Sequence, residues 1–354
     1  MRGSWMIMLL GACGPDVTGG ADTAATDTTS TTDATAPTDG TTATDATTDT
    51  AADGVTWFSH PVPWTRSVAG LLPAPESAAI IGDLEDSGGW GNGDLFQIDF
   101  SIEVLEADAA TPRRSFEPTG DWYETECDLE PVPIPSGGAL EGEDGYECVN
   151  DGDCHLIVRD GDARLLYEMW RANLVGDTFY GGCLAIWDLD RAYGDTLRGR
   201  GCTSADAAGL PIAPLLFSAE EVAAGRIDHA IRFILPNDRI RHRAYVAPAT
   251  HSTGATGGGP DAPPYGVRLR LRADYPLDAL PSEGARVVAR ALQTYGMFLA
   301  DAGQIALTAR SDRFGGVAWE GLLGPRDLSA LAVTDFEVVE LGPVTPWDGE
   351  CVRE

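Results

Sequence analysis

The chain has 354 residues, a formal net charge of −31 at pH 7 and a hydrophobic content of 43%. This excess of acidic side chains favours solubility and disfavours binding to nucleic acid or to an anionic membrane surface. All 24 basic residues are arginine. The absence of lysine excludes Schiff-base chemistry, a pyridoxal phosphate anchor and the lysine of a phosphate-binding loop, and we expect no cofactor.

The N-terminus is typical of an exported lipoprotein. Arg2 precedes an apolar run, and the segment LGAC at residues 10–13 resembles a bacterial lipobox. The resemblance implies that residues 1–12 are a signal peptide and that the thiol of Cys13 carries a lipid. The alternative is an uncleaved hydrophobic N-terminus. We expect an exported protein whose membrane partner is reached through Cys13, at the outer membrane or the cell surface.

Residues 13–54 are a low-complexity segment rich in Thr, Ala, Asp and Gly. Its aspartates recur every four to six residues, at Asp22, Asp27, Asp33, Asp39, Asp45, Asp49 and Asp53. The segment has too few apolar residues to offset the entropy of ordering its backbone. We therefore expect a disordered tether, followed by a single globular domain over residues 55–354.

Alternation of apolar and polar residues predicts strands throughout this domain. In the first strand the apolar residues that share one face are Phe96, Ile98, Phe100, Ile102 and Val104. Further predicted strands cover residues 155–160, 164–170, 183–190, 226–236, 267–275, 304–310 and 335–341. The three that begin at residue 155 are separated by short turns, as in an antiparallel meander.

One main helix is predicted between Ser282 and Asp301. Ser282 follows Pro281 and is a favourable N-cap, and Gly303 is the expected end. The apolar positions at helical spacing are Val288, Ala291, Leu292, Tyr295 and Leu299. These elements predict a β-rich fold with α+β character, mainly an antiparallel β-sandwich with this helix packed against it.

Beyond Cys13 the chain has six cysteines: Cys127, Cys148, Cys154, Cys183, Cys202 and Cys351. An even set in an exported protein predicts three disulfides. Short loops favour Cys148 with Cys154 and Cys183 with Cys202, which leaves Cys127 with Cys351. The alternative is a zinc site, but the cysteines lack the usual ligand spacing and no histidine pair completes a set. We expect no metal.

Five segments resemble a family of exported bacterial proteins. They are TSADAAGLPI (203–212), EVAAGRIDHAIRF (221–233), YGVRLRLRADY (265–275), ARALQTYGMFLADAGQIALTARSDR (289–313) and TDFEVVE (334–340). The resemblance extends from about residue 89 to the end of the sequence. It implies export and one integrated domain, and it assigns no activity and no catalytic residue.

Glu168 and Asp188 form the best candidate carboxylate pair. Both lie among apolar residues on neighbouring predicted strands, which could bring them within the ~5–9 Å that glycoside hydrolysis requires. Trp170 and Trp187 lie beside them, and an aromatic ring can pack on the apolar face of a sugar. The alternative is that both acids are solvent-facing or hydrogen-bonded structural residues.

Two further candidates lie between Cys202 and Phe233. His229 shares the face of its predicted strand with apolar residues and is a candidate general base, or else a core histidine bound to a backbone carbonyl. Asp206 is a candidate acid, or else helps to cap a short helix. Further along the chain, His251 heads a glycine-rich loop and is a candidate binding residue, or else has no chemical role.

Three arginines, Arg268, Arg270 and Arg272, alternate with apolar residues and are predicted to point outward from their strand. Planar guanidinium groups could hold the carboxylates of an anionic polysaccharide. The alternative is a solvated face paired with the chain's own aspartates.

The main functional hypothesis is glycan recognition at the cell surface, with a polysaccharide as the partner. The alternatives are a glycan-cleaving hydrolase and a purely structural envelope protein. The hydrolase would use Glu168 and Asp188, or an acid such as Asp206 together with His229.

Overall fold

The computed structural model describes residues 57–121, 125–149 and 152–354. All of them belong to one compact unit that spans Ala46–Glu354. The predicted signal peptide, Cys13 and the predicted tether up to residue 54 lie outside the described residues. Within the described ranges, no helix has the length and apolar character needed to cross a membrane.

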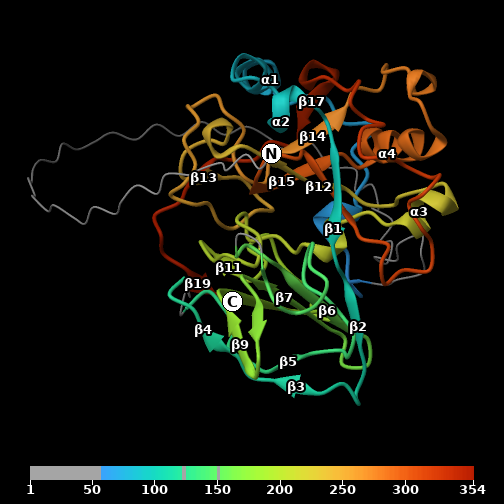
Figure 1. Cartoon of the computed structure of the whole chain (residues 1–354). Helices are drawn as coiled ribbons and strands as arrows, with labels where there is room; N and C mark the ends of the chain where they lie inside the picture. The colour runs from blue at the N-terminus through green and yellow to red at the C-terminus, as the bar shows by residue number, and fades with distance from the viewer. Residues whose placement is uncertain (1–56, 122–124, 150–151) are drawn as a thin grey trace, which may run out of the picture. The chain divides into compact units, whose positions relative to one another are not determined.

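A mixed six-stranded sheet is the largest sheet of the described residues (Figure 1). Its strands, in spatial order, are β1 (Ile98–Ile102), β16 (Leu307–Arg310), β12 (Ile231–Leu235), β15 (Met297–Ala302), β14 (Arg268–Leu271) and β17 (Phe336–Val339). The pairs β1–β16 and β12–β15 are parallel, and the other neighbours are antiparallel. The β-rich prediction is confirmed, but alternation of side chains did not reveal the parallel pairs.

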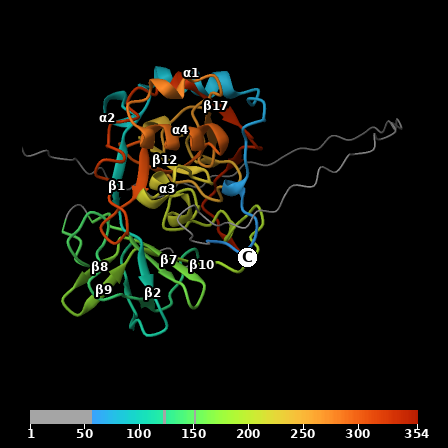
Figure 2. The same cartoon turned by 90° about the vertical axis from the view of Figure 1, so that its right-hand side faces the viewer.

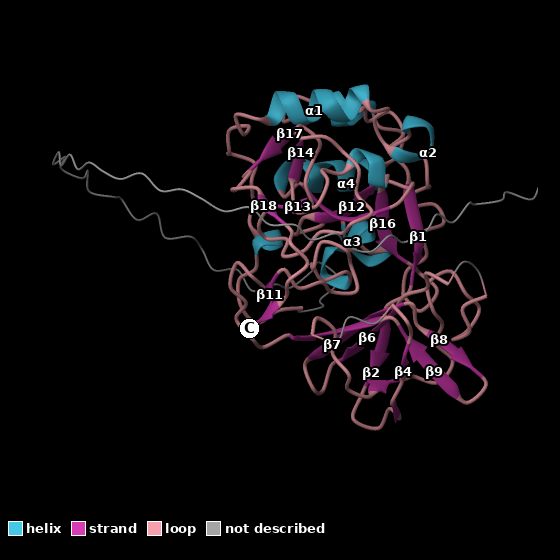
Figure 3. Ribbon diagram, turned by 90° about the vertical axis from the view of Figure 1, so that its left-hand side faces the viewer, coloured by secondary structure: helices cyan, strands magenta, loops and turns pink. Residues whose placement is uncertain are grey.

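A four-stranded sheet follows the order β10 (Cys183–Asp188), β7 (Leu165–Trp170), β6 (Leu156–Asp160) and β2 (Leu105–Ala107) (Figure 3). Its first three strands form the predicted antiparallel meander, and β2 pairs with β6 in parallel. Because β2 follows β1 directly along the chain, these two strands link the sheets.

Both faces of the meander are covered. Leu156, Val158 and Met169 belong to a core on one face. Leu166 and Trp187 belong to the main core, which also includes the residues of the six-stranded sheet. The meander is therefore an internal layer, and a side chain on either of its faces can be buried.

Four α-helices occur in the described part of the chain: α1 (Ser77–Asp86), α2 (Gly91–Asp94), α3 (Ala219–Ala224) and α4 (Glu283–Thr294). Helix α1 contacts β17, and α4 contacts β14 and α3 (Figure 2). The predicted N-cap of α4 is confirmed, since the Oγ of Ser282 accepts a hydrogen bond from the backbone N of Ala285 at 3.1 Å.

The predicted end of this helix is wrong. Helix α4 ends at Thr294, and the residues up to Asp301 continue as β15. The cause is Gly296, whose φ of +71° is unfavourable for other residues and whose position would place a Cβ 2.5 Å from the carbonyl oxygen of Leu269. The apolar spacing did not reveal this change of backbone direction.

Short strands and 3₁₀ turns complete the unit. The strands are β3 (Arg113–Arg114), β4 (Glu117–Pro118), β5 (Val132–Pro133), β8 (Asn173–Val175), β9 (Thr178–Gly181), β11 (Gly199–Arg200), β13 (Ala244–Tyr245), β18 (Thr345–Pro346) and β19 (Val352–Arg353). The 3₁₀ turns are Pro63–Thr65, Ala213–Leu215, Asn237–Arg239, Leu277–Ala279 and Val333–Asp335.

The structure has three disulfides, as predicted, but the six cysteines form only one of the predicted pairs. Cys148 is bonded to Cys154, but the other bonds are Cys127–Cys183 and Cys202–Cys351. The pairings of Cys183 with Cys202 and of Cys127 with Cys351 are therefore wrong. The reason is tertiary: β19 pairs with β11 and carries Cys351 beside Cys202, while the segment after Cys127 hydrogen-bonds to β10.

Candidate functional site

Two adjoining polar cavities meet at Asp301. The first, of about 350 Å³, is lined among others by Trp170, Asp206 and Tyr265. The second, of about 600 Å³, shares Asp153, Asp301 and Ala302 with the first. We call the two together the Asp301 cavity.

Strands β12 and β15 place two charged side chains in this region. Arg232 lies near the start of β12, and Asp301 lies near the end of β15, beyond a register shift that pairs it with Ile234. Asp206 comes from the loop that precedes them, and the loop is tied to β15 because the backbone N of Ala208 donates to the carbonyl oxygen of Ala300 at 2.8 Å.

Arg232 holds Asp206 in a two-point ion pair. Its Nε and one terminal nitrogen donate to the two carboxylate oxygens of Asp206 at 2.7 and 2.6 Å. The other terminal nitrogen donates to Thr308 at 2.9 Å. Both members of the pair are buried. Burial alone would lower the pKa of Arg232, but the Asp206 carboxylate raises it, so the guanidinium stays charged.

Asp301 is the acid of this group whose pKa is raised. Burial and the neighbouring Asp206 carboxylate raise the pKa of Asp301 well above its ordinary value. Arg232 reaches Asp301 at a longer distance of 3.3 Å. Two adjacent carboxyl groups with one nearby cation favour a state with one anion and one neutral acid.

A second buried ion pair lies at the wall of the larger cavity. The Nδ1 of His155 is 2.6 Å from Glu141, and its Nε2 is 3.2 Å from the carbonyl oxygen of Ala205. Burial alone would lower the pKa of His155, but Glu141 raises it to about 9. The imidazolium therefore donates to both partners at neutral pH.

An aromatic ring and a phenol complete the smaller cavity. Trp170 is half-buried, and its indole nitrogen donates to Asp153. Tyr265 is buried, and its hydroxyl makes no hydrogen bond of acceptable geometry with the described residues, although Thr253 lies nearby. The cavity thus combines apolar surface with several converging polar groups, as small-ligand sites do.

The predicted pair of Glu168 and Asp188 does not form. Glu168 pairs with Ala185 across β7 and β10, whereas Asp188 pairs with Leu165. Side chains alternate between the faces of a sheet, so the two carboxyl groups point in opposite directions. Asp188 is exposed, and Glu168 is fully buried.

Glu168 has a structural environment. It accepts hydrogen bonds from the backbone nitrogens of Ile212 and Ala213, both at 2.8 Å, and from the indole of Trp187 at 2.9 Å. Burial raises the pKa of Glu168 to about 7 despite these donors. Trp187 is fully buried as well, which makes it unavailable as the predicted sugar platform.

His229 belongs to the core. Its Nδ1 is 2.8 Å from the carbonyl oxygen of Ala230, and its Nε2 is 3.3 Å from Glu221. It is not among the residues that line the Asp301 cavity. The general-base hypothesis is therefore not supported, and the predicted carbonyl-bound core histidine is what the structure shows.

Asp206 and His251 both line the smaller cavity. The segment that carries Asp206 forms turns and not the predicted short helix, so its side chain caps nothing and is free to pair with Arg232. His251 is buried and hydrogen-bonds through Nδ1 to the carbonyl oxygen of Ala207 at 2.7 Å. Burial lowers the pKa of His251 to about 4, so it is neutral at pH 7.

The prediction that Arg268, Arg270 and Arg272 point outward into solvent is wrong for the first two. Arg268 and Arg270 are buried, and they pair with Glu340 and Glu337 on and next to β17. Both guanidinium groups also donate to backbone carbonyls in the segment 63–68, which covers this face of β14, and Nε of Arg268 donates to the carbonyl oxygen of Tyr295. Only Arg272 is substantially exposed, at 50% of its side chain. The strand therefore offers no ladder of guanidinium groups to an anionic glycan.

The structure adds site residues that the sequence analysis missed: Glu141, Asp153, His155, Arg232 and Asp301. One usable signal was a charged residue inside an apolar strand, as in IRFIL and MFLADA. A charge at such a position requires a partner. The pairing of Arg232 with Asp206 depends on tertiary structure, so the signal alone does not identify it.

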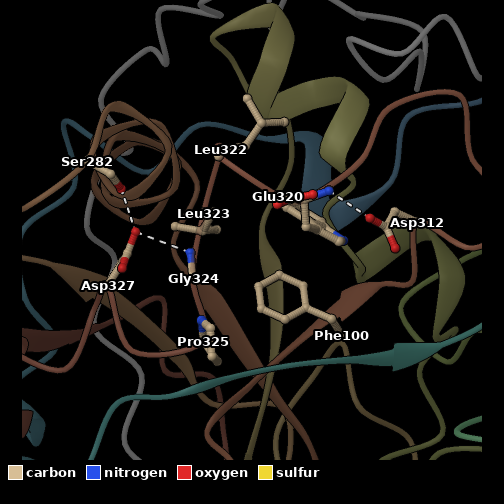
Figure 4. Close-up of a pocket in the computed structure, with 11 residues that line it drawn as sticks. Phe100, Ser282, Asp312, Glu320, Leu322, Leu323, Gly324, Pro325 and Asp327 are labelled. Carbon is tan, nitrogen blue, oxygen red and sulfur yellow. Dashed lines mark hydrogen bonds between the residues drawn. The ribbon is translucent and has the colours of Figure 1, made fainter.

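Another pocket, of about 540 Å³, lies between Phe100 and the loop after Trp319 (Figure 4). Two of its three acidic side chains hold the loop itself. Asp327 accepts hydrogen bonds from Ser282 and from the backbone N of Gly324, and Asp312 accepts one from the backbone N of Trp319. We therefore do not select this pocket as the site.

Glu143, Cys148 and Cys154 are close enough together to suggest a metal centre. The two cysteines are joined in a disulfide and so offer no thiolate to a metal.

No family model, curated protein or solved structure matches this chain. The resemblance of its five segments to exported bacterial proteins stays a prediction, and the site is interpreted from its own geometry.

Proposed function

We propose that the protein is an exported, membrane-anchored glycan-recognition protein and that the Asp301 cavity binds the glycan. The observation that carries the proposal is the half-buried ring of Trp170, which donates to Asp153 and lines the same cavity as Asp301. An aromatic face supplies apolar contact for a sugar ring, and carboxyl groups accept hydrogen bonds from sugar hydroxyls.

Recognition without cleavage is favoured over hydrolysis. Glycoside hydrolysis needs two carboxyl groups separated by about 5–9.5 Å. Asp206 and Asp301 hydrogen-bond to each other, which is closer than that range. In addition, both oxygens of Asp206 are already held by Arg232. This pair can fix a ligand but leaves no room for a sugar carbon between its members.

Export is supported by the disulfides, because such bonds persist in oxidising compartments. Membrane anchoring through Cys13 follows from the lipobox resemblance alone. We expect Cys13→Ser to move the protein from the membrane fraction to the supernatant. Unchanged fractionation of this variant would contradict lipid anchoring.

The binding proposal is tested with the full chain carrying Cys13→Ser on a glycan array. We expect binding to a defined set of glycans and a loss of at least about tenfold in affinity for Trp170→Ala, because an aromatic contact in the cavity is removed. Arg272 is exposed and lies directly after β14. Arg272→Ala is the control and should bind normally. Absence of binding to every glycan, or equal loss in both variants, would overturn the proposal.

A further inference from the structure

We propose that the ligand of the Asp301 cavity carries a primary amine, and that the amine binds as an ammonium ion against Asp153 and Asp301. This inference rests on the proposed function and narrows the ligand to amine-bearing sugars, such as glycans with unacetylated amino groups. Asp153 and Asp301 are the carboxyl groups that line both parts of the cavity.

The first argument is the balance of charge. Five acidic and two cationic side chains line the two parts: Asp99, Glu141, Asp153, Asp206 and Asp301, with His155 and Arg232. Both cations are engaged by the protein itself, Arg232 with Asp206 and His155 with Glu141. His251, the other histidine of the wall, is kept neutral because burial lowers its pKa to about 4. An anionic ligand would find no available cation among these lining residues.

The second argument is independent of charge. The Tyr265 hydroxyl is fully buried in the wall of the smaller cavity without a well-formed hydrogen bond to the described residues. A buried hydroxyl without a partner costs free energy, and a ligand that donates a hydrogen bond recovers it. An ammonium group donates three hydrogen bonds, and Asp153, Asp301 and Tyr265, which all line the smaller cavity, offer acceptors.

The third argument concerns the proton on Asp301. Without ligand, burial and Asp206 raise the pKa of Asp301 well above its ordinary value, which favours the neutral carboxyl group. An ammonium ion can take the place of that proton: R–NH₃⁺ and the Asp301 carboxylic acid give an ammonium–carboxylate pair and release H⁺ to solvent. The net charge of the cavity does not change in this exchange. The charged groups that face Asp301 are Asp153, Asp206, Arg232 and, more distantly, His155.

A divalent metal ion fits the same groups less well. Its two positive charges would lie close to the Arg232 guanidinium, which is 3.3 Å from Asp301. Asp206 would have to give up a two-point ion pair in order to join the coordination. A singly charged ammonium ion is repelled less by Arg232. It also binds without a ligand from Asp206, which keeps its ion pair.

The test compares a glucosamine oligomer with an N-acetylglucosamine oligomer of equal length. Titration calorimetry is run on the full chain carrying Cys13→Ser, in two buffers with different ionisation enthalpies, at a pH where the amine is protonated. We expect the amine to bind at least about tenfold more tightly, with release of close to one proton per ligand. The acetylated oligomer should release none.

Variants locate the effect. Asp153→Asn and Asp301→Asn should each remove most of the amine preference, and Asp301→Asn should also remove proton release. Asp188→Asn, which removes an exposed carboxylate on the opposite face of β10, is the control for the loss of one negative charge and should change neither quantity. Asp153 is exposed, so its variant remains informative if Asp301→Asn does not fold.

Equal binding of the two oligomers, or an unchanged amine preference in the two cavity variants, would overturn the inference. The failure of the proposed function is a different result. In that case no glycan binds, whereas binding of neutral or acetylated glycans without an amine preference leaves the proposed function standing.

Discussion

Glu168 and Asp301 are both acids in the interior of this protein, and burial raises the pKa of both. Their surroundings differ. Glu168 accepts three hydrogen bonds from fixed donors and touches no cavity described here, whereas Asp301 lies on two cavities beside an ion pair. A perturbed pKa indicates a functional site only when solvent or ligand can reach the group. We therefore expect a structural role for Glu168, and Asp301 is the acid that we propose to bind the ligand.

The largest expected effect is on the ion pair beside Asp301. Arg232→Ala leaves the Asp206 carboxylate buried without its partner, which should lower the free energy of unfolding by about 3–5 kcal/mol. Urea unfolding monitored by tryptophan fluorescence measures this change. A loss below about 1 kcal/mol would mean that water or another cation replaces Arg232, and that the pair is less isolated than its burial indicates.

The second effect concerns pH and Glu168. The pKa of Glu168 is about 7 in the folded state against an ordinary value of 4.5. The folded protein therefore keeps this proton between pH 4.5 and 7 while the unfolded chain loses it, so stability falls across that window and is constant above it. The fall amounts to about 3 kcal/mol.

Glu168→Gln should flatten this fall, because the amide does not titrate. Unfolding curves between pH 4 and 8 measure the slope for both proteins. The variant should still bind the ligand of the Asp301 cavity. Loss of binding in a folded Glu168→Gln protein would break the comparison, because it would place Glu168 in the site.

The third effect concerns His155, whose pKa is raised to about 9 from 6.5 by Glu141. Its stabilisation is fully present below pH 6.5 and is lost as the pH rises through about 9. We expect a loss of about 3 kcal/mol over this window in the native protein and a smaller loss in His155→Gln. An identical pH dependence in both proteins would show that the His155–Glu141 pair is not charged.

The smallest effects are expected at exposed residues. Asp188 is exposed, and the Arg272–Asp274 ion pair has side-chain exposures of 50% and 79%. Asp188→Asn and Arg272→Ala should therefore leave the unfolding midpoint and ligand binding unchanged. A clear loss of binding in either variant would place the ligand outside the Asp301 cavity.

The sequence predicted those features that depend on neighbouring residues. The meander β6–β7–β10, the Ser282 cap and the Cys148–Cys154 bond all follow from local spacing and were predicted. The end of α4 was missed because it depends on how closely Gly296 approaches Leu269. The burial of Arg268 was missed for a similar reason, since the segment that covers it lies about 200 residues earlier in the chain.

Of the charged residues at the centre of the candidate site, the sequence predicted Asp206. It also predicted Trp170 and His251, which line the wall of the smaller cavity. The predicted partners Glu168, Asp188 and His229 lie elsewhere, because strand register and the packing of two sheets decide which side chains meet. Arg232 and Asp301 come from parallel neighbouring strands that are about 70 residues apart in sequence. No local sequence pattern indicates that Arg232 and Asp301 lie next to each other.

The Cys202–Cys351 bond has a consequence for the order in which the site is assembled. Its two cysteines are 149 residues apart, and the loop that carries Asp206 begins directly after Cys202. Strands β12 and β15, which carry Arg232 and Asp301, are synthesised between them. The loop can be fastened covalently only after both strands have been made and Cys351 has reached an oxidising compartment. We therefore expect the covalent link beside the proposed binding cavity to close late, after synthesis of the strands and not during it.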